Sequence, residues 1–426
     1  MIKVRNKLSL DAASAPATIT RSPGHLITAD APVARRRLLQ FMLSSPLLAG
    51  AAQAIAQEGD PLIRQIDDAL NVFDFETVAK RTLPPAHWGY LATGVDDELT
   101  IKANREGFTK FGFRARRMID VSKVDMSMEL FGQRFDSPIF LCPVSSQRAF
   151  HNEGEIGAAK AAKAANHLQM LSTLTSYPIE DVLAARGGNG LWYQLYATDQ
   201  FDVTTKVLQR VHAAGVPAVA ITVDLNGGSN RETSARLRRA DKRDCTQCHE
   251  SPRGGTRLAL KPMFKDIDVS KVRSTIPNNI TWDYVKRVRD VYPGKLLIKG
   301  IVTEEDGALA VKHGVDGIVV SNHGGRAEES GRSTIESLTE VLKGTRRKIP
   351  ALIDSGFRRG TDIYKALALG AAAVGVGRPY VWGLAAYGQS GAEAVLKILR
   401  DELRTSMQQA CARSVAEISP ASIVVR

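Results

Sequence analysis

Short apolar runs alternate along most of the chain with longer segments in which apolar residues recur every three or four positions. A run of four to eight mainly apolar residues is typical of a buried strand, and the wider spacing is typical of a helix that packs on one face. The strands predicted in this way span residues 138–143, 168–173, 191–196, 218–224, 295–299, 317–321, 350–354 and 372–377. The predicted helices between them span residues 154–165, 179–185, 201–214, 282–292, 303–313, 333–343 and 360–369.

Strands that alternate with helices in this way predict an α/β fold in which eight parallel strands close into a (β/α)₈ TIM barrel. An open doubly wound sheet is the alternative, but no glycine-rich dinucleotide turn follows the first predicted strand. Residues 74–110 precede the barrel with helical spacing, which predicts an N-terminal helical prelude. A long irregular stretch, residues 225–280, follows the fourth strand, and the 426-residue length suits one large barrel with such extensions.

The first 56 residues do not share this pattern. Arg35-Arg36-Arg37-Leu38-Leu39 precedes an apolar, alanine-rich stretch, and Ala54-Ile55-Ala56 resembles a small-residue cleavage site. This order is typical of a secretory signal, and paired arginines before leucines are typical of the twin-arginine type. We therefore expect an export signal over 1–56, a barrel domain over 57–426 and a periplasmic location. An uncleaved amphipathic arm or a signal anchor is the alternative, although the apolar stretch is too short for a stable membrane span.

The hydrophobic content of 44% and charged content of 24% are ordinary for a soluble globular protein, but the positive charge is unevenly placed. The formal net charge is +12; residues 1–56 hold seven Lys/Arg against two Asp, and residues 231–265 hold ten Lys/Arg against four Asp/Glu. This distribution excludes the continuous basic surface expected of a nucleic-acid-binding protein. It predicts either a local patch that docks an acidic partner or a solvated, flexible loop.

The segment Ser321-Asn322-His323-Gly324-Gly325-Arg326 directly follows a predicted strand. Its two glycines allow the backbone to turn sharply, so a histidine and an arginine leave the same strand end three residues apart. A base beside an anion-binding group suits a substrate that carries a carboxylate next to an acidic or hydridic C–H bond. A loop histidine beside a solvated arginine is the alternative.

Other predicted strands also end in polar residues, and the chemistry of such barrels gathers at the C-terminal strand ends. Arg358 and Arg378 follow strands seven and eight, whose loops are the usual phosphate site of the fold. Ser172, Gln194, Thr222 and Lys299 would suit the edge of a flavin, with Lys299 opposite negative charge on the reduced ring. Asp224 is expected to orient His323 and raise its pKa. Taken singly, each of these residues could instead be a helix cap or loop anchor.

The chain resembles the FMN-dependent 2-hydroxy-acid dehydrogenase/oxidase family. The motifs Gln-Leu-Tyr, Thr-Val-Asp, Ile-Lys-Gly, Ser-Asn-His-Gly-Gly-Arg, Arg-Arg-Gly-Thr-Asp and Gly-Arg-Pro arrive in the family's order between residues 74 and 418. The prelude also contains Tyr90-Leu91-Ala92-Thr93-Gly94, similar to the family's Tyr-x-Ala-Ser-Gly. Members are often tetramers, so a homo-oligomer is compatible with the resemblance.

The resemblance implies a role for each site residue. His323 would be the base, Asp224 its partner and Lys299 the neighbour of the flavin. The substrate would contact Arg326, Arg231, Tyr90 and Tyr196, and Leu174 lies where the family varies with substrate size. FMN would be held by Ser145, Ser172, Gln194, Thr222, Lys299, Ser321, Asp354, Gly356, Arg358, Gly377 and Arg378.

Two segments depart from the family. Ala327-Glu328-Glu329 follows Arg326 where the family has Gln-Leu-Asp, and the segment after strand four is unlike the family's, although Arg231 keeps its spacing from Asp224. These differences leave the form of the substrate lid open.

The segment after strand four also contains Cys245-Thr246-Gln247-Cys248-His249, the pattern that attaches a c-type haem, with His249 as an iron ligand. A short disulfide, free thiols or part of a zinc site are the alternatives, and Cys142 and Cys411 are the remaining cysteines. Met263 is a speculative distal iron ligand.

Together these features predict an exported enzyme that oxidises a small L-2-hydroxy acid with FMN. Its electrons would pass through haem c to an acidic cytochrome or other carrier docked near 231–265. An O₂-using oxidase without haem, or a non-catalytic or maturation redox protein on the same scaffold, are the alternatives.

Overall fold

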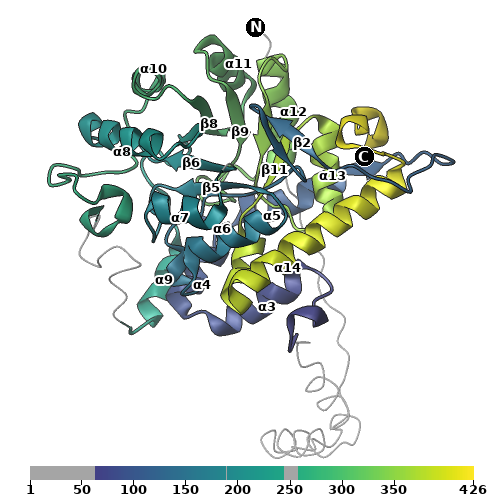
Figure 1. The fold of residues 1–426 in the computed structure, drawn as a ribbon, viewed down its shortest axis with the longest axis horizontal. Coiled ribbons are helices and arrows are strands. Elements are labelled where there is room, and N and C mark those ends of the chain that lie inside the picture. Colours follow the sequence, from purple (N-terminus) through teal and green to yellow (C-terminus); the bar gives the residue numbers. More distant parts are fainter. Residues whose placement is uncertain (1–62, 189, 244–257) are drawn as a thin grey trace, which may run out of the picture. The chain divides into compact units, whose positions relative to one another are not determined.

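In the computed structural model, which describes residues 63–188, 190–243 and 258–426, eight parallel strands form a closed barrel (Figure 1). The predicted TIM barrel is thus confirmed, and the ring closes where β11 pairs with β4. Most strands end one or two residues earlier than predicted, because their polar last residues already belong to the loops, whereas β8 continues through an irregularity after Lys299. The strands are β4 (Ile139–Leu141), β5 (Leu168–Ser172), β6 (Leu191–Leu195), β7 (Ala218–Thr222), β8 (Lys295–Ile301), β9 (Gly317–Val320), β10 (Ala351–Ile353) and β11 (Ala373–Val376).

Helices surround the barrel and agree with the predicted ones to within two residues at each end. These are α6 (Gly154–Ala164), α7 (Ile179–Arg186), α8 (Phe201–Ala213), α10 (Trp282–Val291), α11 (Glu304–Lys312), α12 (Thr334–Thr345) and α13 (Gly360–Leu369). The long helix α14 (Arg378–Ala410) was not predicted, and it kinks at Tyr387 and Gly388. Gly388 has a φ of +63°, and a Cβ there would lie 2.6 Å from a carboxylate oxygen of Glu153, so the kink requires glycine.

The predicted prelude is helical, but it is divided into α3 (Val72–Thr82), α4 (Pro85–Ala92) and α5 (Leu99–Glu106). Prolines 84 and 85 separate the first two helices, since proline cannot continue a helix but suits its first turn. Asn71 caps α3 by accepting from the Phe73 amide at 2.9 Å, and α3 then packs along α14 (Figure 1). The loop after α4 contacts the loops that follow β9 and β7, where the amides of Val95 and Asp96 donate to the carbonyls of Gly325 and Asn230.

Two short antiparallel pairs were missed, because three-residue strands leave little pattern in a sequence. In the first, β2 (Met128–Leu130) and β3 (Gln133–Phe135) cover the N-terminal end of the barrel, where the Phe131 and Trp192 rings lie 5.4 Å apart. In the second, β1 (Phe111–Phe113) pairs with β12 (Ile423–Val425) near the C-terminus. The barrel interior beyond this cover is filled by apolar side chains.

The stretch 225–280 is less irregular than predicted. Its described part contains the helix α9 (Glu232–Ala240) and the short 3₁₀ turns η4 (Leu258–Leu260) and η5 (Pro262–Phe264). Because α9 packs against α4, the first part of the basic segment is a helix and not a flexible loop. Met263 is fully buried in the hydrophobic core, and its suggested role as a distal iron ligand stays a prediction.

The proposed export signal 1–56 and the haem motif residues Cys245, Cys248 and His249 lie outside the described residues. Among the helices of the described part, none combines the length and the apolar character that a membrane crossing requires.

Candidate active site

Several of the polar strand ends line one cleft at the C-terminal end of the barrel, which with the solvent at its mouth encloses about 690 Å³ of empty space. The cleft wall does not include Ser172, Gln194, Thr222, Asp224, Arg231 and Ser321. Of these, Ser172, Asp224 and Ser321 bond to the wall residues Ser145, His323 and Lys299. Leu174 does not line the cleft either; its carbonyl accepts from the Ser146 amide at 3.0 Å. The predicted site residues in the wall are Tyr90, Ser145, Tyr196, Lys299, His323, Arg326, Asp354, Gly356, Arg358, Gly377 and Arg378.

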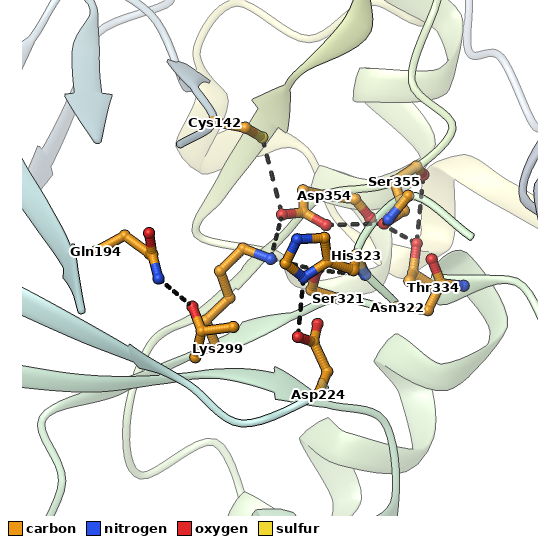
Figure 2. Close-up of polar contacts among 12 residues, drawn as sticks. Cys142, Gln194, Asp224, Lys299, Ser321, Asn322, His323, Thr334, Asp354 and Ser355 are labelled. Atoms are coloured by element: carbon orange, nitrogen blue, oxygen red, sulfur yellow. Dashed lines mark hydrogen bonds and ion pairs between the residues drawn. The ribbon is translucent and has the colours of Figure 1, made fainter. Parts of the chain in front are cut away.

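His323 lies in the turn after β9, in the left-handed conformation with φ of +57°. Its Nδ1 is 2.9 Å from Asp224 Oδ1 (Figure 2). Its Nε2 lies 3.3 Å from the Tyr196 hydroxyl. The Ser321 hydroxyl accepts from the His323 amide at 3.1 Å and so fixes the turn. A strained backbone held by such contacts is typical of a functional position, and it points the imidazole into the cleft.

The pKa of His323 lies below its ordinary value of 6.5, contrary to the expected increase. Burial is the largest cause, since it disfavours the charged imidazole, and the positive charges of Lys299 and Arg326 act in the same direction. Asp224 does raise the pKa of His323, but not enough to reverse the shift. Burial raises the pKa of Asp224, yet His323 and Lys299 outweigh it and keep this carboxylate ionised.

Two arginines from different loops lie close to the ring of Tyr90. The guanidinium carbon of Arg326 lies 4.4 Å from the ring centre, and that of Arg231 lies 5.5 Å away. The Nε groups of both arginines are buried without a hydrogen-bond partner among the described residues. Burial raises the pKa of Tyr90, but the charges of Arg326 and Arg231 reverse the effect and lower it. Buried donors that lack an acceptor indicate a binding site for an anion.

Lys299 occupies the floor of the cleft. Its Nζ lies 3.3 Å from Asp354 Oδ2 and donates to the Ser321 hydroxyl at 2.7 Å (Figure 2). Burial lowers the pKa of Lys299, but the carboxylates of Asp354 and Asp224 outweigh it and raise the pKa. The ammonium group therefore remains charged, as the prediction of a cation beside the cofactor requires.

Two further strand-end pairs border this floor. The Gln194 amide donates to the Thr222 hydroxyl at 2.8 Å, and the hydroxyls of Ser145 and Ser172 lie 3.0 Å apart. The amide and hydroxyl groups predicted for a flavin edge are thus brought together, although their sequence positions span 78 residues (145 to 222).

Arg358 and Arg378 meet at the opposite end of the cleft. Arg358 packs 4.6 Å over the Trp382 ring, while Arg378 donates to the carbonyls of Leu91, Gly324 and Thr93. Within the described residues, no carboxylate forms an ion pair with either guanidinium. Burial, reinforced by Arg105, lowers the pKa of Arg358 to about 10. Glu76 acts on both guanidiniums but does not offset the lowering of their pKa values. Two shielded cations that no carboxylate pairs directly fit a phosphate group, so the donor set suits flavin mononucleotide.

The prediction missed a buried amide pair that fixes the catalytic turn. Asn322 and Asn104 of α5 donate to each other's side-chain oxygens at 2.9 Å. Asn322 also accepts from the Gly325 amide at 3.1 Å, while Asn104 accepts from the Thr334 amide at 3.2 Å. Asn322 lies inside the conspicuous hexapeptide, but nothing in the sequence indicates that its partner is on a prelude helix.

The segment after Arg326 forms hydrogen bonds with the prelude. The Glu329 carboxylate accepts from the amides of Leu99 at 2.8 Å and Thr100 at 3.2 Å, at the start of α5. The adjacent Glu98 has φ of +62° and does not cap the helix with its own side chain. Glu329, at the position of the family's aspartate, therefore supplies the missing N-terminal cap.

We predict that Glu329→Gln lowers the free energy of unfolding by about 1 kcal/mol, because a neutral amide interacts less favourably with a helix N-terminus. The melting temperature should fall by roughly 2–4 °C. Glu328→Gln is the matched control, since the partners of that carboxylate among the described residues are the amide and hydroxyl of Ser330 in its own loop. Equal melting temperatures for the two variants would contradict the capping role.

Comparisons with known proteins agree with this geometry. The model of the FMN-dependent dehydrogenase family matches residues 79–425. Glycolate oxidase 1 of Zea mays is 38% identical over 357 residues, which cover 83% of this chain and 95% of the relative. Glycolate oxidase of Spinacia oleracea is 37% identical over 370 residues, with the same two coverages.

Solved structures give the same result. A soluble mutant of the membrane-associated (S)-mandelate dehydrogenase from Pseudomonas putida matches with a TM-score of 0.76 and 31% identity, covering 84% of this chain and 99% of that one. A flavocytochrome b2 mutant with pyruvate bound matches with a TM-score of 0.74 and 28% identity, covering 93% of this chain and 91% of that one. The fold, the strand-end motifs and these similarities agree: the chain belongs to the FMN-dependent dehydrogenase family.

Proposed function

We propose that this enzyme oxidises a small L-2-hydroxy acid to the 2-oxo acid. The observation that carries the proposal is the pair of buried guanidinium Nε groups, of Arg231 and Arg326, that have no partner among the described residues and lie close to the Tyr90 ring. Arg326 is also close enough to His323 to lower its pKa. A carboxylate is the acceptor that such donors bind best. The similarity to glycolate oxidases and to a mandelate dehydrogenase supports the same substrate class.

In this mechanism the substrate carboxylate binds Arg326, Arg231 and the Tyr90 hydroxyl. Neutral His323 then accepts a proton from the substrate through Nε2, while Asp224 accepts from Nδ1–H and stabilises the imidazolium. Burial, together with Tyr90 and Asp224, raises the pKa of Tyr196, so its hydroxyl stays protonated and can donate to the substrate oxygen. The strand-end residues would hold FMN, with Arg358 and Arg378 as the groups that bind its phosphate. FMN would supply the acceptor for the two electrons and for the second hydrogen that the substrate loses.

The lowered pKa of His323 predicts the pH dependence of flavin reduction. The base works when neutral, so the rate should fall as the pH drops through the histidine pKa, with a midpoint below 6.5. Asp224→Asn removes the group that raises this pKa, which should move the midpoint to still lower pH and reduce the rate. Anaerobic stopped-flow measurements of kcat/KM against pH test both shifts. A midpoint at or above 6.5 in the unaltered enzyme would contradict the proposal.

The substrate class is tested by anaerobic reduction of the flavin. Glycolate, lactate and mandelate are mixed singly with the flavin-loaded protein, and at least one should bleach the flavin absorbance. The amide of the same acid is the matched control, because it keeps the hydroxyl and C–H but lacks the charge that the two arginines bind. Bleaching by the amide at an equal rate, or by none of the acids, would refute the proposal.

We further propose that the protein is exported to the periplasm by residues 1–56 and that Cys245, Cys248 and His249 carry a c-type haem. The electrons would then leave singly for an acidic cytochrome or other carrier. The described residues support the docking surface: Arg236, Arg238 and Arg239 are exposed on α9, which packs on the helix that carries Tyr90. Electrostatic complementarity of this kind mainly accelerates association.

A visible spectrum separates this proposal from its alternatives. After expression with the haem maturation machinery, the reduced protein should show c-type haem bands, and Cys245→Ser with Cys248→Ser should remove them. A pure flavin spectrum together with peroxide formation would favour an O₂-using oxidase. A flavin that no hydroxy acid reduces would favour a non-catalytic redox or maturation protein. Cleavage before residue 57 in the periplasmic fraction tests export.

A further inference from the structure

The C-terminal end of α4 is covered by two arginine side chains from the barrel. A helix end leaves its last carbonyls without partners inside the helix. Here Arg231 Nη2 donates to the carbonyls of Gly89 at 3.3 Å and Tyr90 at 2.8 Å, and Arg378 Nε donates to that of Leu91 at 2.9 Å. The helix that carries Tyr90 is thereby tied to the loops after β7 and β11.

Thr93 accepts hydrogen bonds from both of these arginines. Its carbonyl accepts from Arg231 Nη2 at 3.2 Å and from Arg378 Nη2 at 3.3 Å. Its hydroxyl donates to the Gly89 carbonyl at 2.7 Å and accepts from Arg231 Nη2 at 3.1 Å. The Thr93 side chain is buried, so water does not replace these contacts.

These hydrogen bonds oppose the electrostatic repulsion between the arginines of the site. Arg231, Arg326 and Arg378 are like charges that influence one another in a shielded site, and repulsion favours their separation whenever no anion lies between them. The C-terminal end of a helix carries partial negative charge, which attracts cations. Because Nη2 of Arg231 is held there, its buried Nε, unpartnered within the described residues, is left for an incoming carboxylate.

We propose that Thr93 is a positioning residue that holds Arg231 in its carboxylate-binding orientation before the substrate arrives. A preorganised donor binds an anion more tightly, because the cost of ordering it has already been met in the free protein. This inference rests on the proposed function, since it assumes that Arg231 binds the substrate carboxylate.

The test compares three variants of the flavin-loaded protein. Thr93→Val keeps the β-branched shape but lacks the hydroxyl, and Thr93→Ser keeps the hydroxyl. Thr82→Val is the matched control, because the Thr82 hydroxyl makes the same bond to a carbonyl four residues back, Val78 at 2.9 Å, at the end of α3 and away from the arginines. Oxalate is the probe, and its Kd is read from the change in flavin absorbance, which requires no turnover.

We expect Thr93→Val to raise the Kd of oxalate about tenfold, the usual effect of losing one hydrogen bond to a charged group. Thr93→Ser should restore the Kd to within about twofold of the unaltered protein, and Thr82→Val should leave it unchanged. In an Arg231→Met background, Thr93→Val should add no further loss, because its effect passes through that arginine.

Equal loss of affinity in the two backgrounds, or failure of Thr93→Ser to restore binding, would overturn the inference. If Thr93→Val does not fold, the same two comparisons are made with Thr93→Ala. If no hydroxy acid reduces the flavin while the oxalate results hold, the proposed function fails separately from the role of Thr93.

Discussion

Replacing His323 with alanine is expected to slow flavin reduction by the best 2-hydroxy acid about 10²- to 10⁴-fold, the usual contribution of a positioned base. The imidazole faces the cleft between Asp224 and Tyr196, and neither neighbour can take its place. Asp224 is buried behind the ring, and the raised pKa of Tyr196 keeps its phenol protonated. Anaerobic stopped-flow spectroscopy measures the reduction rate, and the bound flavin is quantified from the same spectrum.

His313→Ala is the matched control for this experiment. His313 stacks on Trp282 with ring centres 4.8 Å apart, outside the cleft, so its loss should leave flavin reduction unchanged. FMN content should be retained in both variants, because His323 is not among the groups that would hold the phosphate. A His323→Ala enzyme that reduces its flavin at the full rate would refute the assignment of the base.

The barrel could be predicted because each of its strands is enclosed on both faces. Ile139–Leu141 and Gly317–Val320 are buried at every position, so their sequences are continuous apolar runs. The helix α9 was missed for the opposite reason: of its nine residues only Ser234 is buried, and its sequence resembles that of a charged loop. The break in α14 was not predicted either, because the side chain that packs against Gly388 is that of Glu153, at the N-cap of α6 and far away in the sequence.

Much of the site could be predicted from the rule that all strands of such a barrel end at the same rim. Since barrel strands end at the same rim, Asp224 and His323 could be expected to meet although 99 residues separate them. The contacts that Thr93 and Asn104 of the prelude make with the site could not be predicted, because the barrel topology does not determine where the prelude packs. The pKa of His323 was predicted in the wrong direction, since the sequence identifies its partner carboxylate but not the burial that outweighs it.

Arg326→Met should weaken binding of the substrate by about 3 kcal/mol, or roughly 150-fold in Kd, as expected when one partner of a shielded charge pair is removed. Methionine has a similar length and can still pack on the Tyr90 ring, so the change isolates the guanidinium charge and its donors. Arg231 remains near the same ring, with its guanidinium carbon 5.5 Å from the ring centre, so binding should weaken without being abolished. The Kd of oxalate and the concentration dependence of flavin reduction measure this loss separately from the rate of the chemical step.

Arg332→Met is the control, because Arg332 lies six residues further along and pairs at the surface with Glu340. Its oxalate Kd should match that of the unaltered enzyme. Arg326→Lys should recover part of the affinity, since an ammonium keeps the charge but loses the forked pair of donors. If Arg326→Met binds oxalate as tightly as Arg332→Met does, the carboxylate does not bind between the two arginines, and the substrate orientation that places its C–H bond before His323 would have to be abandoned.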